Sequence, residues 1–107
     1  MVDRETLEPG ETYFSVFYVD EELRIPSIET YVYLGSDVAD EATEPRVVHL
    51  FQYAHSYFSD GNWNDLSAET KDRFDEAPLI SFEGQHLEPI FDADGLLVEL
   101  QQWRGRL

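Results

Sequence analysis

The chain contains no cysteine among its 107 residues. It therefore has no disulfide framework and no thiolate nucleophile, and any metal site has to use histidine, carboxylate or backbone oxygen ligands. No apolar run approaches the roughly 20 residues that a membrane-spanning helix needs. The first residues also lack the basic stretch followed by an apolar stretch that is typical of a secretory signal peptide. We therefore expect no membrane contact and a cytoplasmic location.

Positive charge is the second scarce feature. The chain has 23 Asp and Glu against 7 Lys and Arg, which gives a formal net charge of −16. Phosphates would meet carboxylates on such a surface, so nucleic acids and anionic lipids are excluded as partners. The same surface attracts cationic proteins, at a rate that falls as salt rises. A second interpretation stays open, in which the acidity serves solubility in a salt-rich cytoplasm.

Recognisable catalytic motifs are also absent from the sequence, which holds neither a Gly-x-Ser-x-Gly elbow nor a glycine-rich phosphate loop. Residues 92–95 (Asp-Ala-Asp-Gly) are similar to the start of a calcium loop, but its first and twelfth positions would be Ile90 and Gln101, which supply no carboxylate. We predict no enzyme, no cofactor and no metal site. A small metal-dependent enzyme remains an alternative, using His86 with Glu83 or Glu88, or His49 with His55.

Aromatic residues, by contrast, are abundant. Seven Phe, six Tyr and two Trp make up 14% of the chain, enough for a core that a disordered chain of this charge would lack. Residues 1–12 differ, because acidic side chains surround Pro9 and Gly10 there with little apolar content. We predict a flexible acidic arm over residues 1–12 and a single α+β domain over residues 13–107.

Two strands are predicted near the start of this domain. Residues 13–19 are rich in aromatic and β-branched side chains, and residues 27–34 alternate in character. Together they predict an antiparallel hairpin with one aliphatic face and one face lined by tyrosines. Residues 35–37 (Gly-Ser-Asp) are expected to end the second strand, and residues 37–45 to form a loop. A further short strand is predicted over residues 79–82.

Two segments fit more than one structure. Residues 46–58 alternate like a strand buried on both faces, yet they also place apolar side chains at helical spacing. We favour a strand to Tyr53 followed by a short helical segment to Phe58. Residues 94–104 place apolar side chains at i, i+1, i+4 and i+7, which favours a helix over a hairpin turning at residues 92–95.

The clearest helix signal follows Asp65 and Ser67, either of which can cap a first turn, and Pro78 ends it. With the helix over residues 94–104, this predicts an α+β fold in which a small antiparallel sheet of three to four strands carries two helices packed on one face. Such a sheet has open edges, so we also predict a homodimer through the hairpin edge or the tyrosine face.

Two aromatic features suit partner binding. Tyr31 and Tyr33 lie on the tyrosine face, and Trp63 lies in a polar loop; both residue types are favoured at interfaces. Burial against the core is the alternative for each of them. A continuous carboxylate patch would need four residues to connect the acidic loops on either side of the second strand. These residues are Glu29, Asp72, Asp75 and Glu76.

The combined features favour a small acidic protein-binding module or inhibitor that engages a basic partner protein, as an immunity protein or a nucleic-acid mimic does. One alternative is a salt-adapted intracellular domain whose acidity serves solubility only. The other is the small metal-dependent enzyme described above.

Overall fold

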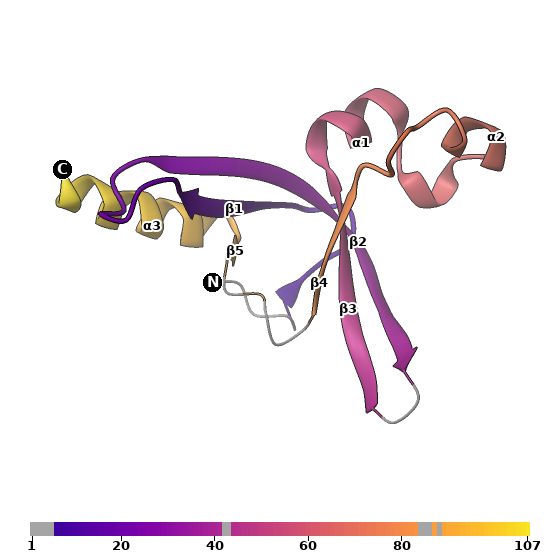
Figure 1. Ribbon diagram of the computed structural model, residues 1–107, viewed down its shortest axis with the longest axis horizontal. Helices are drawn as coiled ribbons and strands as arrows, with labels where there is room; N and C mark the ends of the chain where they lie inside the picture. Colours follow the sequence, from indigo (N-terminus) through magenta and orange to yellow (C-terminus); the bar gives the residue numbers. More distant parts are fainter. Residues whose placement is uncertain (1–5, 42–43, 84–86, 88) are drawn as a thin grey trace.

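The computed structural model describes residues 6–41, 44–83, 87 and 89–107. Its strands form one antiparallel sheet in the order β4-β3-β2-β1-β5 (Figure 1). The strands are β1 (Thr12–Tyr18), β2 (Pro26–Glu41), β3 (Glu44–Tyr53), β4 (Leu79–Glu83) and β5 (Ile90–Phe91). The α+β prediction is confirmed, but the predicted three to four strands are wrong, because the sheet has five. The missed strand, β5, has only two residues, too few to show any periodicity.

The β1–β2 hairpin has the predicted antiparallel pairing, with a register from Thr12↔Val32 to Tyr18↔Pro26. Its connection is held by the Asp20 carboxylate, which accepts hydrogen bonds from the backbone N–H groups of Arg24 and Ile25, the shortest at 2.8 Å. An aspartate that binds its own following backbone in this way favours a turn over continued strand.

Strand β2 runs further than the sequence predicts. Gly35 does not end it, because the glycine has φ 138° and forms a bulge at which the pairing with β3 shifts register. The strand then continues, and its backbone pairs with β3 as far as Glu41↔Glu44. The predicted loop is therefore wrong for residues 37–41 and 44–45, and residues 42–43 lie outside the described part of the chain. Glycine weakens a strand, but its freedom at positive φ also permits a bulge that keeps the strand going.

The far part of β2 and β3 projects from the sheet as a two-stranded ribbon (Figure 1). β1 pairs with β2 only up to Val32, and β4 pairs with β3 only up to Val48. The body of the sheet therefore lies where all of these strands overlap, and the core lies there too.

The helical elements are α1 (Ala54–Asp60), the 3₁₀ turn η2 (Trp63–Asp65), α2 (Ala68–Lys71) and α3 (Ala93–Arg106). The strand to Tyr53 followed by a helical segment is confirmed, and so is the helix over residues 94–104.

The helix predicted between Ser67 and Pro78 is much shorter than expected. The Ser67 hydroxyl caps α2 by accepting a hydrogen bond from the Thr70 N–H, but α2 has only four residues. The chain then tightens into i→i+3 turns, in which Phe74 N–H donates to the Lys71 carbonyl. The ring of Phe74 packs edge-on against Trp63 at 5.3 Å, a contact that favours this turn over another turn of helix.

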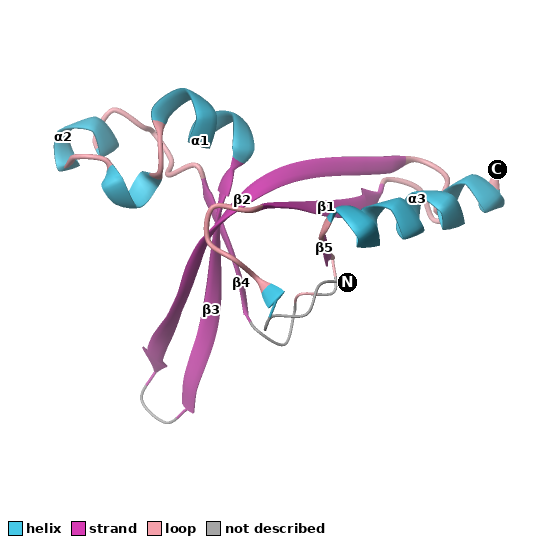
Figure 2. Ribbon diagram, turned by 180° about the vertical axis from the view of Figure 1, so that it is seen from behind, coloured by secondary structure: helices cyan, strands magenta, loops and turns pink. Residues whose placement is uncertain are grey.

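The helices lie at opposite ends of the molecule rather than side by side on one face (Figure 2). α1 packs against β2 and β3, while α3 packs against β1 and β5. The indole N–H of Trp103 fastens α3 to the hairpin by donating to the Arg24 carbonyl at 2.7 Å. Within the described ranges no helix is both long and apolar enough to cross a membrane.

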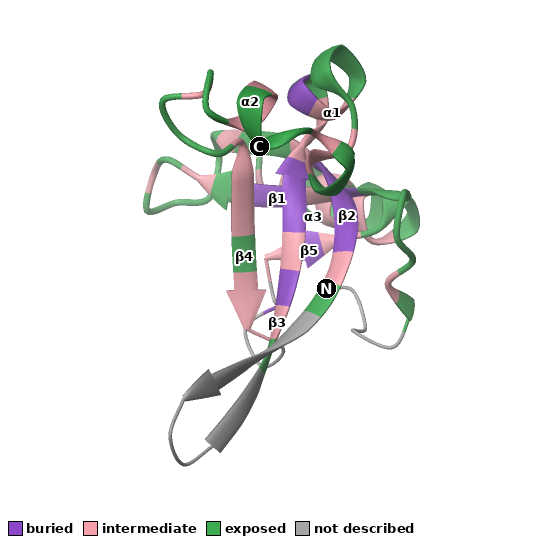
Figure 3. Cartoon of the chain, turned by 90° about the vertical axis from the view of Figure 1, so that its right-hand side faces the viewer, coloured by how far each residue is buried: buried purple, intermediate pink, exposed green. Residues whose placement is uncertain are grey.

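The core occupies the centre of the sheet, where β1, β2 and β3 carry their buried stretches (Figure 3). Its buried cluster consists of Tyr13, Tyr31, Tyr33, Phe51, Leu87 and Ile90. Phe51 is 0% exposed and its ring contacts four other aromatic rings. The face that the sequence marks as lined by tyrosines is therefore the core of the protein.

Candidate functional site

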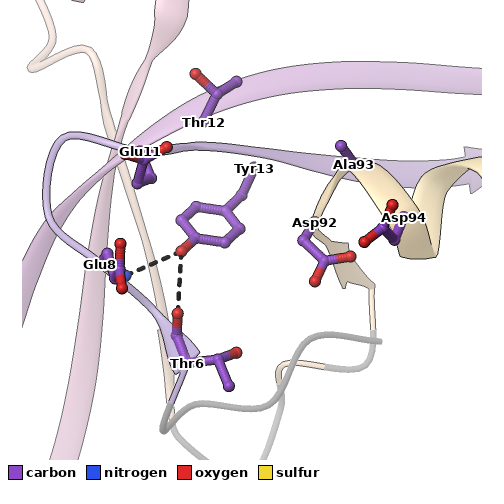
Figure 4. Close-up of a pocket in the computed structure, with 8 residues that line it drawn as sticks. All are labelled: Thr6, Glu8, Glu11, Thr12, Tyr13, Asp92, Ala93 and Asp94. Atoms are coloured by element: carbon purple, nitrogen blue, oxygen red, sulfur yellow. Dashed lines mark hydrogen bonds between the residues drawn. The ribbon is translucent and has the colours of Figure 1, made fainter.

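Two segments far apart in the sequence, residues 6–13 and 92–94, line a cavity of about 280 Å³ (Figure 4). The lining residues are Thr6, Glu8, Glu11, Thr12, Tyr13, Asp92, Ala93 and Asp94. Glu8 and Glu11 lie on one side, Asp92 and Asp94 on the other, and the Tyr13 ring lies between them (Figure 4). Four of the eight described lining residues are carboxylates and none of these eight is basic, so this part of the cavity wall is strongly anionic.

Backbone hydrogen bonds hold the first side of this cavity in place. Glu11 N–H donates to the Glu8 carbonyl across a turn in which Gly10 has φ 88°. This turn is docked on β2 by two further bonds, from Gly10 N–H to the Tyr33 carbonyl at 2.8 Å and from Tyr33 N–H to the Glu11 carbonyl at 3.0 Å. Leu7 also packs against the core. Residues 6–12, which belong to the segment predicted as an arm, are thus tied to the sheet, while residues 1–5 lie outside the described part of the chain.

Tyr13 forms the inner wall of the cavity. Its side chain is 5% exposed, its hydroxyl accepts a hydrogen bond from Glu8 N–H at 2.9 Å, and it donates to the Thr6 carbonyl at 3.4 Å. Its ring packs edge-on against Tyr33 at 6.3 Å and Phe51 at 6.2 Å. The wall of the cavity is therefore continuous with the core, which gives the site a rigid base.

The other side of the cavity is the beginning of α3. Asp92 is the N-cap and accepts a hydrogen bond from Gly95 N–H at 2.7 Å, and Asp94 lies in the first turn. Carboxylates at these positions stabilise a helix whether or not a ligand is present. The helix end contributes roughly half a positive charge. The four carboxylates outweigh this contribution, so the cavity favours a cation.

The size and spacing of the cavity decide which kind of cation fits. Among the residues that the structure describes, no group of three His, Asp or Glu side chains is arranged to hold a metal ion. The cavity volume of about 280 Å³ also lies just below the roughly 300–1,000 Å³ typical of small-molecule sites. The arrangement suits one extended cationic group, such as an arginine or lysine side chain, which can reach carboxylates on both sides.

The two tyrosines predicted to bind a partner are core residues instead. Tyr31 is 2% exposed and Tyr33 is 4% exposed. Burial raises the pKa of both phenols, most of all through loss of contact with water. Ser15 donates a hydrogen bond to the Tyr31 hydroxyl, and the Tyr33 hydroxyl lies 3.0 Å from Nδ1 of His49. Their side chains therefore present no surface to a partner.

Trp63 is half-buried at the end of the sheet near α1 and α2. Its backbone N–H donates to Oε1 of the fully buried Gln52 at 2.9 Å, and its ring contacts Phe74. The ammonium of Lys71 lies 5.4 Å from the centre of the indole ring, within the range of a cation–π contact. Trp63 thus closes this end of the core, and part of its ring remains exposed.

The predicted carboxylates are exposed but do not form one patch. Glu29 lies on β2 opposite Ser15, in the part of the sheet that carries β1. Asp72, Asp75 and Glu76 follow α2, at the end of the molecule opposite α3 (Figure 1). The structure therefore does not connect the acidic loops through these four residues.

Of the residues predicted for a metal-dependent enzyme, the structure does not bring His49 and His55 together. His49 is buried on β3 beside Tyr33, whereas His55 is exposed on α1. His86 and Glu88 lie outside the described residues.

Sequence reasoning missed the anionic cavity. The acidic character of its two segments is visible in the sequence, but their proximity depends on how the first turn docks on β2 and on β5 pairing with β1.

No protein-family model matches the chain, and neither a characterised protein nor a solved structure shows significant similarity to it.

Proposed function

We propose that the protein is a small acidic binding module or inhibitor that engages a basic partner protein. The observation that carries this proposal is the anionic cavity, in which four carboxylates from two segments face one space and no described lining residue is basic. A guanidinium or ammonium group inserted there would form charge-assisted hydrogen bonds with these carboxylates. The Tyr13 wall would pack against the aliphatic stem of the inserted side chain.

The net charge of −16 supports the same proposal at longer range. An overall negative potential steers cationic proteins toward the surface and repels nucleic acids. A partner that uses a basic surface to bind phosphates would have that surface masked, which is how immunity proteins and nucleic-acid mimics inhibit. The cavity then supplies a defined contact within a broad attraction.

A matched pair of variants tests the role of the cavity. The cavity variant carries Glu8→Gln, Glu11→Gln and Asp94→Asn, and it leaves the N-cap Asp92 intact. The control variant carries Glu21→Gln, Glu22→Gln and Asp65→Asn, three exposed positions outside the cavity. Both variants lose three negative charges of the same residue types, so a difference between them reports on the site rather than on net charge.

Proteins from the source cell are captured on the immobilised wild type and on both variants at about 50 mM and about 500 mM salt. Interactions between exposed charges are strong at the lower salt concentration and largely screened at the higher one. We expect a basic protein that binds the wild type and the control at low salt, binds the cavity variant weakly, and dissociates at high salt. Absence of a basic protein at low salt, or equal capture by all three proteins, would contradict the proposal.

A second candidate function is a salt-adapted domain whose acidity carries no information about partners. Exposed carboxylates at both ends of the molecule favour it, for example Glu21 in the β1–β2 connection and Asp75 after α2. This candidate predicts a melting temperature that rises steeply with salt, with both charge variants more stable than the wild type at low salt. A melting temperature that does not change with salt would contradict the salt-adapted candidate.

A further inference from the structure

Among the described strands, β4 forms one edge of the sheet and pairs with β3 alone (Figure 3). Tyr53 N–H donates to the Pro78 carbonyl at 3.0 Å, and Phe51 lies opposite Ile80 in the register. In an antiparallel pair, alternate residues direct both backbone groups toward the partner strand. Pro78, Ile80 and Phe82 therefore face β3, whereas the N–H and C=O groups of Leu79 and Ser81 point to the open side.

Among the described residues this edge has little of the usual protection, and Glu83 is its one charged side chain. Natural edge strands are commonly guarded by lysine, proline, a bulge or a covering element. Residues 79–83 (Leu-Ile-Ser-Phe-Glu) contain no lysine or proline, and their pairing with β3 is regular throughout. Leu79 and Ser81 take part in no backbone hydrogen bond with a turn or loop in the part of the chain that the structure describes. The edge is thus ready to pair with another strand.

We propose that β4 is a docking edge for an extended, basic segment of the partner protein, which adds to the sheet as a sixth strand. The proposal rests on the proposed function and deepens it by naming the conformation of the bound segment and the edge that receives it. Recognition of this kind uses backbone hydrogen bonds for affinity and alternate side chains for specificity.

Charge favours a basic segment over a second copy of this chain. Exposed carboxylates precede β4 at Asp72, Asp75 and Glu76, and Glu83 ends the strand. Two copies paired antiparallel through β4 would place the acidic start of each strand beside Glu83 of the other, between molecules that each carry a charge of −16. Like charges on adjacent strands destabilise pairing, whereas arginine or lysine at the same places stabilises it.

β4 and the anionic cavity lie toward opposite edges of the sheet, and a series of aromatic contacts on one face connects them. The Tyr13 ring of the cavity wall is 6.2 Å from the Phe51 ring, which is 5.7 Å from the ring of Phe82 on β4. Ile80 and Phe82 are only half-buried, so apolar side chains of an added strand would cover them. One partner can therefore place a cationic side chain in the cavity and a strand on β4.

The test uses a synthetic peptide of alternating valine and arginine, matched in length to β4, and the full chain labelled with ¹⁵N. Amide hydrogen exchange is followed with and without the peptide. We expect exchange at Leu79 and Ser81 to slow at least about tenfold, because their N–H groups gain partners. Exchange at Ile80, whose N–H is already bonded to β3, stays the same.

Two changes separate backbone pairing from simple charge attraction. A peptide N-methylated on its pairing edge keeps its charge but loses its donors, and we expect it to bind at least about tenfold more weakly. On the protein, Ser81→Pro removes one outward N–H without touching the bonds to β3, since proline is tolerated at edge positions. Ser81→Ala keeps that N–H and is the matched control, which should bind like the wild type.

Equal binding of the methylated and unmethylated peptides would overturn the β4 proposal, and the cavity variant would still test the proposed function by itself. Equal protection by a valine–threonine peptide would show that the edge pairs without regard to charge, which overturns the claim of a basic segment. Protection of Leu79 and Ser81 by self-association, with no peptide present, would replace the partner with a second copy.

Discussion

The substitution Phe51→Ala tests whether the aromatic cluster is what holds the sheet together. Phe51 is 0% exposed, and its ring lies 5.1 Å from Tyr33, 5.7 Å from Phe82, 6.0 Å from Tyr31 and 6.2 Å from Tyr13. Removing a buried phenylalanine ring typically costs about 3–5 kcal/mol, because the lost burial is compounded by the cavity left behind. Domains of this size have a total stability of about 5–15 kcal/mol. We therefore expect the variant to lose about a fifth or more of its stability.

Urea unfolding followed by circular dichroism measures this loss of stability. In a thermal melt of the same variant, the melting temperature should fall by at least about 10 °C. Phe58→Ala is the control, because the Phe58 side chain is 77% exposed and its loss should change stability by less than about 0.5 kcal/mol. A loss below about 1 kcal/mol for Phe51→Ala would refute the assignment of the core.

Three further predictions concern the elements that shape the site. Asp92→Ala removes the cap bond to Gly95 N–H and should lower the free energy of unfolding by about 1 kcal/mol in chemical denaturation. Gly35→Ala meets no atom within 4 Å but has to adopt φ 138°, so we expect a loss of about 1–3 kcal/mol from backbone strain alone. Burial raises the pKa of Tyr31, so the folded chain keeps a phenol proton that the unfolded chain releases. Its contribution to stability is complete below the unfolded pKa of about 10 and is lost as pH rises through the folded value. Tyr31→Phe should therefore show a shallower fall of melting temperature above about pH 10, and an unchanged slope would contradict the shift.

Where the chain's pattern is local and regular, the sequence was sufficient to predict structure. The β1–β2 hairpin follows from aromatic and alternating segments, and α3 follows from its apolar spacing, with Asp92 and Asp94 at its start. Residues 46–58 fit both a strand and a helix, and the favoured division into a strand to Tyr53 and a helical segment after it agrees with the structure.

The failures have physical causes. The sequence predicts that β2 ends at Gly35, but this glycine has a positive φ and forms a bulge, after which β2 continues. Tyr31 and Tyr33 were candidates for an exposed face because both faces of the hairpin carry apolar side chains, and alternation does not say which face is covered. Phe51 of the neighbouring strand β3 packs beside the tyrosines on this face, and Leu7 and Leu87 pack against the cluster. The anionic cavity depends on contacts between distant segments, which composition does not reveal.

The most direct test of the account is the affinity of one purified basic partner for three proteins at low salt, measured by calorimetry. Exposed ion pairs contribute about 0.2–1 kcal/mol each. Loss of three cavity carboxylates through Glu8→Gln, Glu11→Gln and Asp94→Asn should therefore cost about 0.6–3 kcal/mol and weaken binding by about threefold to a hundredfold. The control variant with the same loss of charge elsewhere should stay within about threefold of the wild type. If both variants weaken binding equally, the attraction belongs to net charge alone and the cavity is not the binding site.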